Sequence, residues 1–200
     1  MPSPLKILVI LGSTREGRYG DKPARWLHDR LAADPRLAPE LVDLRDWPLP
    51  FFDQPRAPAR VTDGNYGNDV ANRWAATVAA ADGFAITAAE YNHGYTAVLK
   101  NALDWLAREW RRKPVTFLGY GALGGARAVE QLRGVAVELE LAPIRHAVHI
   151  SREVLLATMK EPVPANPALF APVEPAAAAM IEELVWWGRA LRHARTTVDE

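Results

Sequence analysis

The chain has 200 residues, no cysteine, and 24 basic against 24 acidic side chains, so its formal net charge is zero. At roughly 150 residues per domain this length predicts one domain, and the lack of cysteine excludes disulfides, thiol nucleophiles and Cys-ligated metal centres. The balanced charge argues against the basic field that nucleic-acid binding requires, so no nucleic-acid partner is expected. The apolar run at residues 7–11 is too short for a membrane span or a signal peptide. We therefore expect a cytoplasmic protein without a membrane partner.

Short apolar runs alternate with helical patterns in the first 150 residues. Residues 6–11 predict a strand that is buried on both faces. A helix follows, with Asp21 as its cap and Pro23 in its first turn, and a weaker strand is expected at residues 40–44. Residues 45–68 contain four prolines and little periodicity. They predict one long loop, which in a compact domain is usually functional.

The rest of the chain continues the alternation and then changes character. Further helices are expected at residues 69–80, about 96–109 and 128–139, and further strands at 82–87, 115–119 and 144–150. Five prolines in residues 162–175 predict an extended arm, and a last helix is expected from about residue 175 to 195, before a frayed tail. We divide the chain into a domain of residues 1–160 and an appendage, residues 161–200, packed on the same domain.

Five β-α alternations predict an α/β fold with an open parallel sheet, because parallel strands need crossover helices. Ligands of such sheets bind beyond the carboxyl ends of the strands. The segments of interest therefore follow the first, third and fourth predicted strands. We name them loop one (residues 12–20), loop three (residues 88–95) and loop four (residues 120–127).

Loop one combines three glycines with two hydroxyls and two arginines, and a helix is expected to begin after it. Such a loop suits a phosphate, because glycine permits unusual backbone angles and a helix N-terminus attracts anions. It matches neither Gly-x-Gly-x-x-Gly nor Gly-x-x-x-x-Gly-Lys-Ser/Thr, which speaks against a dinucleotide fold or a nucleoside triphosphatase. The alternative is a polar turn with surface arginines.

Loops three and four suit a flat ring. Loop three offers aromatic side chains and the amide of Asn92, which can stack on a heteroaromatic ring and hydrogen-bond its edge. The glycines of loop four let backbone N–H groups approach a ligand closely. A phosphate on loop one and a ring between loops three and four describe a mononucleotide with a tricyclic base.

These motifs resemble the NADPH-dependent FMN reductase family. The resemblance covers about residues 5–150 and is densest in AEYNHGYTAVLKNALDW, residues 89–105, with further matches at residues 12–15, 119–121 and 124–128. It implies an α/β, flavodoxin-like three-layer sandwich, in which a five-stranded parallel sheet of order 2-1-3-4-5 has helices on both faces. It also implies FMN as the cofactor, NADPH or NADH as co-substrate, and a small electron acceptor such as a quinone, an azo dye, a metal oxyanion or free flavin.

Carried over residue by residue, the resemblance implies that loop one binds the FMN phosphate through Ser13, Thr14 and Arg15, with Arg18, Tyr19 and Gly20 closing around it. It implies that the ring and the ribityl chain contact loops three and four, at Glu90, Tyr91, Asn92, His93, Gly94, Tyr120, Gly121 and Gly124. No catalytic side chain is expected, because the chemistry is centred on the flavin, and no metal is expected. The chain departs from the family at Ala89 and Thr96, where proline is common.

Several residues keep two interpretations. His93 is either a proton donor to a reduced quinone or an exposed loop histidine. Arg127 either faces the cofactor or pairs with Glu130. Lys100 and Asp104 have the spacing of a structural ion pair on a helix.

Aromatic residues outside the loops suggest further contacts. One residue of the pair Trp186–Trp187 is expected to meet the core or another subunit, and the family resemblance favours a homodimer or homotetramer. The loop at residues 45–68 is a candidate wall for the nicotinamide or acceptor pocket, because it carries Trp47, Phe51, Phe52 and Tyr66.

A rival function is that of a flavodoxin-like FMN-binding electron carrier without nicotinamide-driven turnover. Zero net charge speaks against it, because such carriers are typically acidic and dock electrostatically. The physiological acceptor and the preference for NADPH or NADH stay open.

Overall fold

The computed structural model describes residues 3–197, and its centre is a parallel sheet. The strands have the order β2-β1-β3-β4-β5, and β6 also pairs with β4. This is the predicted 2-1-3-4-5 order, and the α/β, flavodoxin-like three-layer prediction is confirmed. The strands are β1 (Leu5–Leu11), β2 (Leu37–Asp43), β3 (Gly83–Ala89), β4 (Pro114–Tyr120), β5 (Ala142–Pro143) and β6 (Val148–His149).

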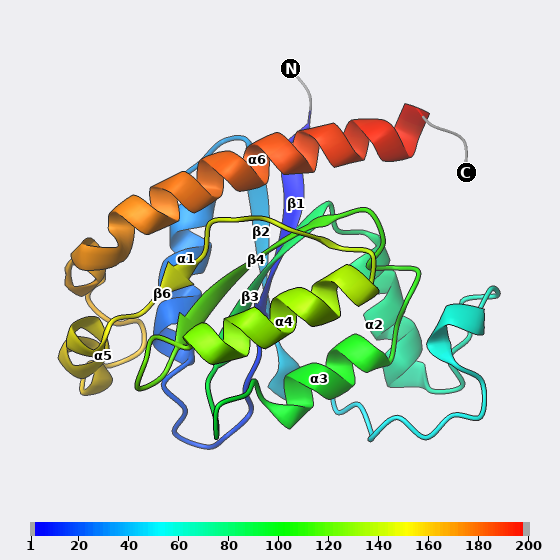
Figure 1. Ribbon diagram of the computed structural model, residues 1–200, viewed down its shortest axis with the longest axis horizontal. Coiled ribbons are helices and arrows are strands. Elements are labelled where there is room, and N and C mark those ends of the chain that lie inside the picture. Colours follow the sequence, from blue (N-terminus) through cyan, green and yellow to red (C-terminus); the bar gives the residue numbers. More distant parts are fainter. Residues whose placement is uncertain (1–2, 198–200) are drawn as a thin grey trace.

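Helices cover both faces of the sheet (Figure 1). The alternating side chains of β1 belong to two separate apolar clusters, with Ile7 and Val9 in one and Leu8 and Ile10 in the other, as expected for a strand covered on both faces. The first cluster lies under α1 (Asp21–Ala32), α5 (Arg152–Met159) and α6 (Glu174–Thr197). The second lies under α2 (Asp69–Ala79), α3 (Ala97–Asp104) and α4 (Ala126–Glu138).

Polar side chains begin several of these helices. The Asn68 amide oxygen accepts hydrogen bonds from two backbone N–H groups at the start of α2, and the hydroxyl of Thr96 accepts one at the start of α3, so each satisfies donors that the helix itself leaves unpaired. The prediction that Asp21 caps α1 is wrong. Gly20 occupies the cap position, and the carboxylate of Asp21 instead binds Arg18.

The helix predicted at residues 96–109 is shorter than expected, because α3 ends at Asp104. Beyond this point the tryptophan indoles bind backbone carbonyls. Trp110 donates to the carbonyl of Leu103, and Trp105 donates to the carbonyl of Pro50. Trp105 and Trp110 are fully buried. Burial of these two rings therefore sets the path of the chain after Asp104, where apolar spacing alone predicted that the helix would continue.

The fifth strand, predicted as one run at residues 144–150, is interrupted. Two short strands, β5 and β6, pair with β4 at separate places. Between them, side chains bind the backbone: Thr116 donates to the carbonyl of His146, and Arg133 donates to the carbonyls of Ile144 and Arg145. Side-chain donors thus take the place of a continuous ladder.

The C-terminal region contains more helix than its prolines suggested. The eight-residue helix α5 was not predicted, and residues Pro167–Val173 form a 3-10 helix where an extended arm was expected. Phe170 in that segment stacks on Trp26 of α1, with ring centroids 4.8 Å apart. The last helix, α6, confirms the predicted one and reaches Thr197, while the prediction for residues 198–200 lies outside the described residues.

The long loop between β2 and α2 is fastened to α3. It contains only two 3-10 turns, Leu44–Asp46 and Pro58–Arg60. Asn101 accepts a hydrogen bond from the N–H of Phe52 and donates to the carbonyls of Leu49 and Pro50. At its tip the ring of Phe51 is 80% exposed. No helix within residues 3–197 is long and apolar enough to span a membrane.

Candidate active site

Loops one, three and four meet at the carboxyl edge of the sheet, at the lower end of Figure 1. The N–H of Gly12 donates to the carbonyl of Thr87 in β3 at 3.2 Å, and the N–H of Glu90 donates to the carbonyl of Tyr120 at 2.9 Å. A methyl group at Gly12 would lie 2.5 Å from the Thr87 oxygen. Glycine is therefore required where loop one leaves the sheet.

The two kinds of backbone group in loop one have different partners. Its carbonyl oxygens accept hydrogen bonds from side chains of the protein. Four successive carbonyls, those of residues 12–15, each accept a hydrogen bond from a side chain. The donors are the Thr96 hydroxyl, the Arg18 guanidinium and, for the last two carbonyls, the Arg45 guanidinium. Thr96, one of the two departures from the family pattern, thus both caps α3 and binds loop one.

The N–H groups of the same segment are free of protein acceptors. Within residues 3–197, none of the five backbone N–H groups of residues 13–17 donates to a protein atom. Successive free N–H groups beside a helix N-terminus form an anion-binding cradle. The donor set of loop one therefore fits the phosphate group of FMN.

Arg18 lies beneath loop one rather than on its surface. Its side chain is 1% exposed, and its guanidinium donates to both carboxylate oxygens of Asp21 and to Asp43 at the end of β2. Burial alone would lower the pKa of Arg18, but these bonds outweigh it and raise the pKa. With its donors occupied by two carboxylates and the Ser13 carbonyl, Arg18 holds the shape of the loop.

Ser13 and Tyr120 form a second buried support. Their hydroxyl oxygens lie 3.0 Å apart, Ser13 is 1% exposed, and burial raises the pKa of Tyr120 to about 12, so the phenol keeps its proton at neutral pH. A methyl group on Gly20 would overlap the Tyr120 oxygen. The three residues thus lie in contact at the base of loop one.

Tyr19 connects loop one to the C-terminal region. Its ring contacts the ring of Tyr120, with centroids 5.4 Å apart, and its hydroxyl lies 2.7 Å from the Thr158 hydroxyl in α5. Lys22 donates to the carbonyl of Met159 at the end of the same helix. Helix α5, which sequence reasoning missed, therefore packs beside the phosphate-type loop.

Loop three contains a tight turn with unusual backbone angles. Tyr91 and Gly94 exchange two backbone hydrogen bonds, and the residues between them, Asn92 and His93, have φ values of 51° and 70°. This is the pattern of a type I′ turn, in which both central residues have positive φ. The side chains of Tyr91, Asn92 and His93 are exposed at the edge of the sheet.

An ion pair joins loops three and four. The Glu90 side chain is 4% exposed, and Arg127 donates to it from both its guanidinium and its backbone N–H. The same guanidinium lies 2.9 Å from Nε2 of His93. The predicted pairing of Arg127 with Glu130 is wrong, because its carboxylate partner is Glu90. Its Nη1 donates to His93, so that ring nitrogen accepts.

Loop four presents backbone donors on its open side. Gly121 has a φ of 151°, which favours glycine, and within residues 3–197 the N–H groups of residues 121–123 donate to no protein atom. Gly124 differs, because it is buried and its carbonyl accepts a hydrogen bond from His149 at 2.9 Å. The open part of loop four is therefore residues 121–123.

The predicted site residues differ in exposure, and four of them are half-buried: Tyr19, Glu90, Gly94 and Gly121. Exposed at the edge are Thr14, Arg15, Tyr91, Asn92 and His93, while the buried support beneath them includes Ser13, Arg18, Gly20, Tyr120 and Gly124. Sequence reasoning missed Asp43 and Arg45. A usable signal existed, because Asp43 ends β2 and Arg45 lies in the turn after it, and in a 2-1-3-4-5 sheet the carboxyl end of β2 lies beside loop one.

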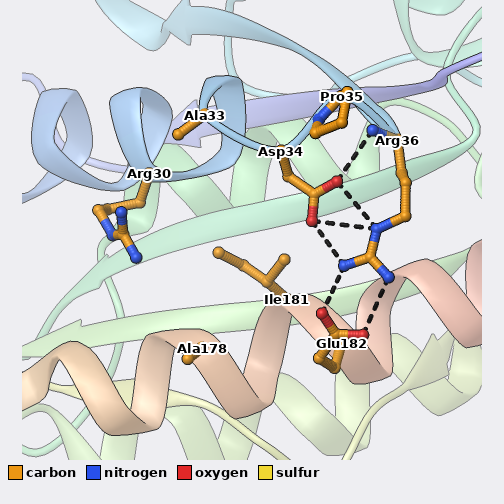
Figure 2. Close-up of a pocket in the computed structure, with 8 residues that line it drawn as sticks. All are labelled: Arg30, Ala33, Asp34, Pro35, Arg36, Ala178, Ile181 and Glu182. Carbon is orange, nitrogen blue, oxygen red and sulfur yellow. Dashed lines mark hydrogen bonds and ion pairs between the residues drawn. The ribbon is translucent and has the colours of Figure 1, made fainter.

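An open pocket elsewhere contains none of these residues. It has a volume of about 430 Å³ and lies between α6 and the turn that precedes β2, at the amino edge of the sheet (Figure 2). There Arg36 bridges Asp34 and Glu182, and Arg30 pairs with Glu174. Because the charged side chains around this pocket pair with one another, we interpret it as a structural contact between α6 and the turn before β2.

Other proteins match most of the chain. The family model "NADPH-dependent FMN reductase" matches residues 5–154. An NAD(P)H-dependent FMN reductase of Schizosaccharomyces pombe is 37% identical over 159 residues, covering 78% of this chain and 79% of that protein. A quinone reductase of Escherichia coli K12 is 32% identical over 146 residues, covering 70% of this chain and 73% of that protein.

Solved structures repeat the fold. The flavoenzyme NAD(P)H:(acceptor) oxidoreductase FerB from Paracoccus denitrificans superposes with a TM-score of 0.70 over 93% of this chain and 98% of that one, at 20% identity. A flavodoxin from Pseudomonas aeruginosa superposes with a TM-score of 0.53 over 90% of this chain and 99% of that one, at 15% identity. The sequence matches, together with the three loops at the carboxyl edge, establish that the chain belongs to the NADPH-dependent FMN reductase family.

Proposed function

We propose that loops one, three and four bind FMN, with the phosphate on loop one and the ring between loops three and four. Membership of the family makes the chain an oxidoreductase that uses FMN and a reduced nicotinamide. Bound FMN would supply the hydride chemistry, accepting from NADPH or NADH and passing reducing equivalents to a small acceptor. The acceptor would be a quinone, an azo dye, a metal oxyanion or free flavin, and the quinone is supported by relatives named quinone reductase.

The observation that carries this proposal is the polarity of loop one. The carbonyls of residues 12–15 accept hydrogen bonds from side chains, and the N–H groups of residues 13–17 find no acceptor in the described part of the chain. The segment can therefore hold an anion without a dedicated cationic contact. Arg15 is exposed beside these groups and would add a charge-assisted hydrogen bond to a phosphate.

The chain's other residues would orient the ring and supply donors. The exposed side chains of Tyr91 and Asn92 offer a stacking face and an amide, and the free N–H groups of residues 121–123 offer donors to a ring edge where negative charge develops on reduction. We assign no acid or base role to a side chain, because hydride transfer needs none. The loop at residues 45–68 remains our candidate for the wall of the nicotinamide or acceptor pocket.

The alternative is a flavodoxin-like electron carrier. The curated relatives quoted above are reductases, and the likeness to a flavodoxin is one of fold alone, at 15% identity. We further propose a homodimer or homotetramer in the cytoplasm. An exposed ring at Trp186, 63% accessible beside the half-buried Trp187 that packs on the core, supports a subunit contact.

The decisive experiment is to load the purified protein with FMN, record its visible spectrum, and add NADPH and then NADH without oxygen. Bleaching of the flavin band supports a nicotinamide-driven flavoenzyme, and reoxidation rates with a quinone, an azo dye and free flavin then rank the acceptors. Bound FMN that neither nucleotide bleaches would favour the carrier. No bound FMN would overturn the assignment of all three loops.

A further inference from the structure

Arg45 lies outside every motif that pointed to the site, yet it contacts the backbone of loop one. It is the middle residue of the 3-10 turn that follows β2, and Asp43 accepts a hydrogen bond from its N–H at 2.9 Å. Its Nη2 donates to the carbonyl of Arg15 at 2.6 Å, and its Nε donates to the carbonyl of Thr14 at 3.3 Å. One planar guanidinium therefore binds two successive carbonyls.

This contact helps to set which way two peptide groups of loop one face, and for the Thr14 carbonyl it supplies the donor. A carbonyl without a donor is free to rotate, and a carbonyl oxygen that turned toward a bound phosphate would repel it. Loop one has no regular secondary structure at residues 12–15 to prevent such rotation. The Arg45 guanidinium holds the Thr14 carbonyl on the protein side, and it shares the Arg15 carbonyl with the backbone N–H of Arg18, which donates to it at 3.2 Å. The neighbouring N–H groups therefore stay on the open side.

The position of Arg45 separates this role from a direct contact. Its nitrogens face the carbonyl side of the loop, and its third nitrogen lies 4.0 Å from the carboxylate of Asp21. Asp43 joins Arg45 to Arg18, because its carboxylate also accepts from the Arg18 guanidinium. Thus the carboxyl end of β2 supports loop one through two arginines.

We propose that Arg45 is a positioning residue for the phosphate group, acting through the Thr14 and Arg15 carbonyls rather than on the ligand. The inference rests on the proposed function, since it assumes that the anion on loop one is the phosphate of FMN. It predicts an effect that depends on the phosphate and on the two-pronged shape of the guanidinium. A general contribution to folding would show neither dependence.

The test compares FMN with riboflavin, which has the same ring and no phosphate, by titration of flavin fluorescence. For Arg45→Ala the Kd of FMN is expected to rise about tenfold, the usual size of one lost charge-assisted hydrogen bond, while the Kd of riboflavin changes less than about twofold. Arg45→Lys is expected to weaken FMN binding nearly as much as Arg45→Ala does, because an ammonium is a point charge and cannot bind both carbonyls as a fork.

The matched control is Arg60→Ala, which removes the same charge from an exposed arginine in the other 3-10 turn of the same loop. It is expected to leave both Kd values unchanged. Arg45→Lys also keeps the test available if the alanine variant does not fold, since it retains the charge and the long side chain.

Four results would bear against the inference in different ways. Equal losses for FMN and riboflavin would overturn it in favour of a structural role, and a wild-type Kd for FMN in Arg45→Lys would overturn it in favour of simple charge. A wild-type protein that binds riboflavin and FMN equally would instead remove the phosphate from loop one, and one that binds neither would refute the proposed function itself.

Discussion

The buried carboxylate of Glu90 accepts a hydrogen bond of 2.6 Å from Nε of Arg127, and this pair joins the loop after β3 to the helix after loop four. Glu90 itself is covered while Arg127 is partly exposed. The two loops that flank the proposed ring site are therefore joined by this ion pair in addition to the hydrogen bond from the Glu90 N–H to the Tyr120 carbonyl.

Replacing Arg127 should consequently loosen the ring site. In Arg127→Ala the Glu90 carboxylate would lose its partner in a buried position, at a cost of about 1–3 kcal/mol of folding free energy. Because the ring contacts both loops, the affinities for FMN and riboflavin should fall together. Urea denaturation and flavin titration measure the two effects, and Glu130→Ala on the same helix is the control. Unchanged flavin affinity would separate this pair from the ring site.

Gly20 should not tolerate a side chain while Tyr120 keeps its hydroxyl. The added methyl group of Gly20→Ala overlaps the phenol oxygen, so we expect a loss of about 1–3 kcal/mol of stability, as for other overpacked sites. The double variant with Tyr120→Phe removes the overlapping atom and should recover part of that loss. A double-mutant cycle by urea denaturation measures the coupling, and additive effects would contradict the contact.

Asp43 should make stability depend on acid pH. Burial acts to raise its pKa, but hydrogen bonds from Arg18 and from the N–H of Arg45 outweigh burial and hold the pKa below its ordinary value of 3.8. A carboxyl with a lowered folded pKa stabilises above its unfolded pKa, and this contribution disappears as the pH falls through the folded pKa.

The measurement is the difference in unfolding free energy between the wild type and Asp43→Asn. At pH 7 we expect about 1–2 kcal/mol, a charged hydrogen bond discounted for partial exposure. The difference should shrink below pH 4. A difference that stays constant from pH 7 to pH 3 would show that the carboxylate charge contributes nothing.

Asn92 allows the turn geometry of loop three to be separated from its side-chain chemistry. With a φ of 51°, Asn92→Ala places alanine in the left-handed region at a cost of roughly 1 kcal/mol, whereas Asn92→Gly costs no such strain. If the amide contacts the flavin, both variants should alter its visible spectrum. If only the alanine variant does so, the turn matters and the amide does not, and two unaltered spectra would remove Asn92 from the site.

Asn101 tests the role of the long loop. Its amide makes three hydrogen bonds to residues 49–52, so Asn101→Ala should release that segment and raise the KM for the acceptor by about tenfold while leaving the Kd of FMN unchanged. Lys100→Ala is the matched control, because its partner is Asp104 on the same helix. An unchanged KM would place the acceptor pocket elsewhere.

The first four strands and the three loops were predictable because each depends on local pattern, whereas the strand order came from the family resemblance. Residues 6–11 are continuously apolar, and the glycines of loop one stand where the chain must leave the sheet. The Lys100–Asp104 pair was also predictable from spacing alone, and it is present at 2.6 Å.

The supports beneath the site were not predictable, because they depend on residues far apart in the sequence. Arg45 binds Thr14 and Arg15 about 30 positions away, and Tyr120 binds Ser13 across 107 positions. No periodicity reports such pairs. Likewise, a guanidinium in a glycine-rich loop suggests a phosphate contact, whereas Arg18 proves to be bound by two carboxylates that only the folded chain brings near.

The interrupted fifth strand has a consequence for how copies of this chain can associate. A long, regular edge strand invites another sheet to extend it, and proteins avoid this with short strands, proline and charge. Here one edge is broken into two-residue strands and carries Pro143, while the other, β2, carries Pro39 and a charged residue, Glu40, paired with Lys6. Neither border of the sheet offers an uninterrupted row of donors and acceptors, so the proposed association of copies is expected to use helices and loops rather than to continue the sheet.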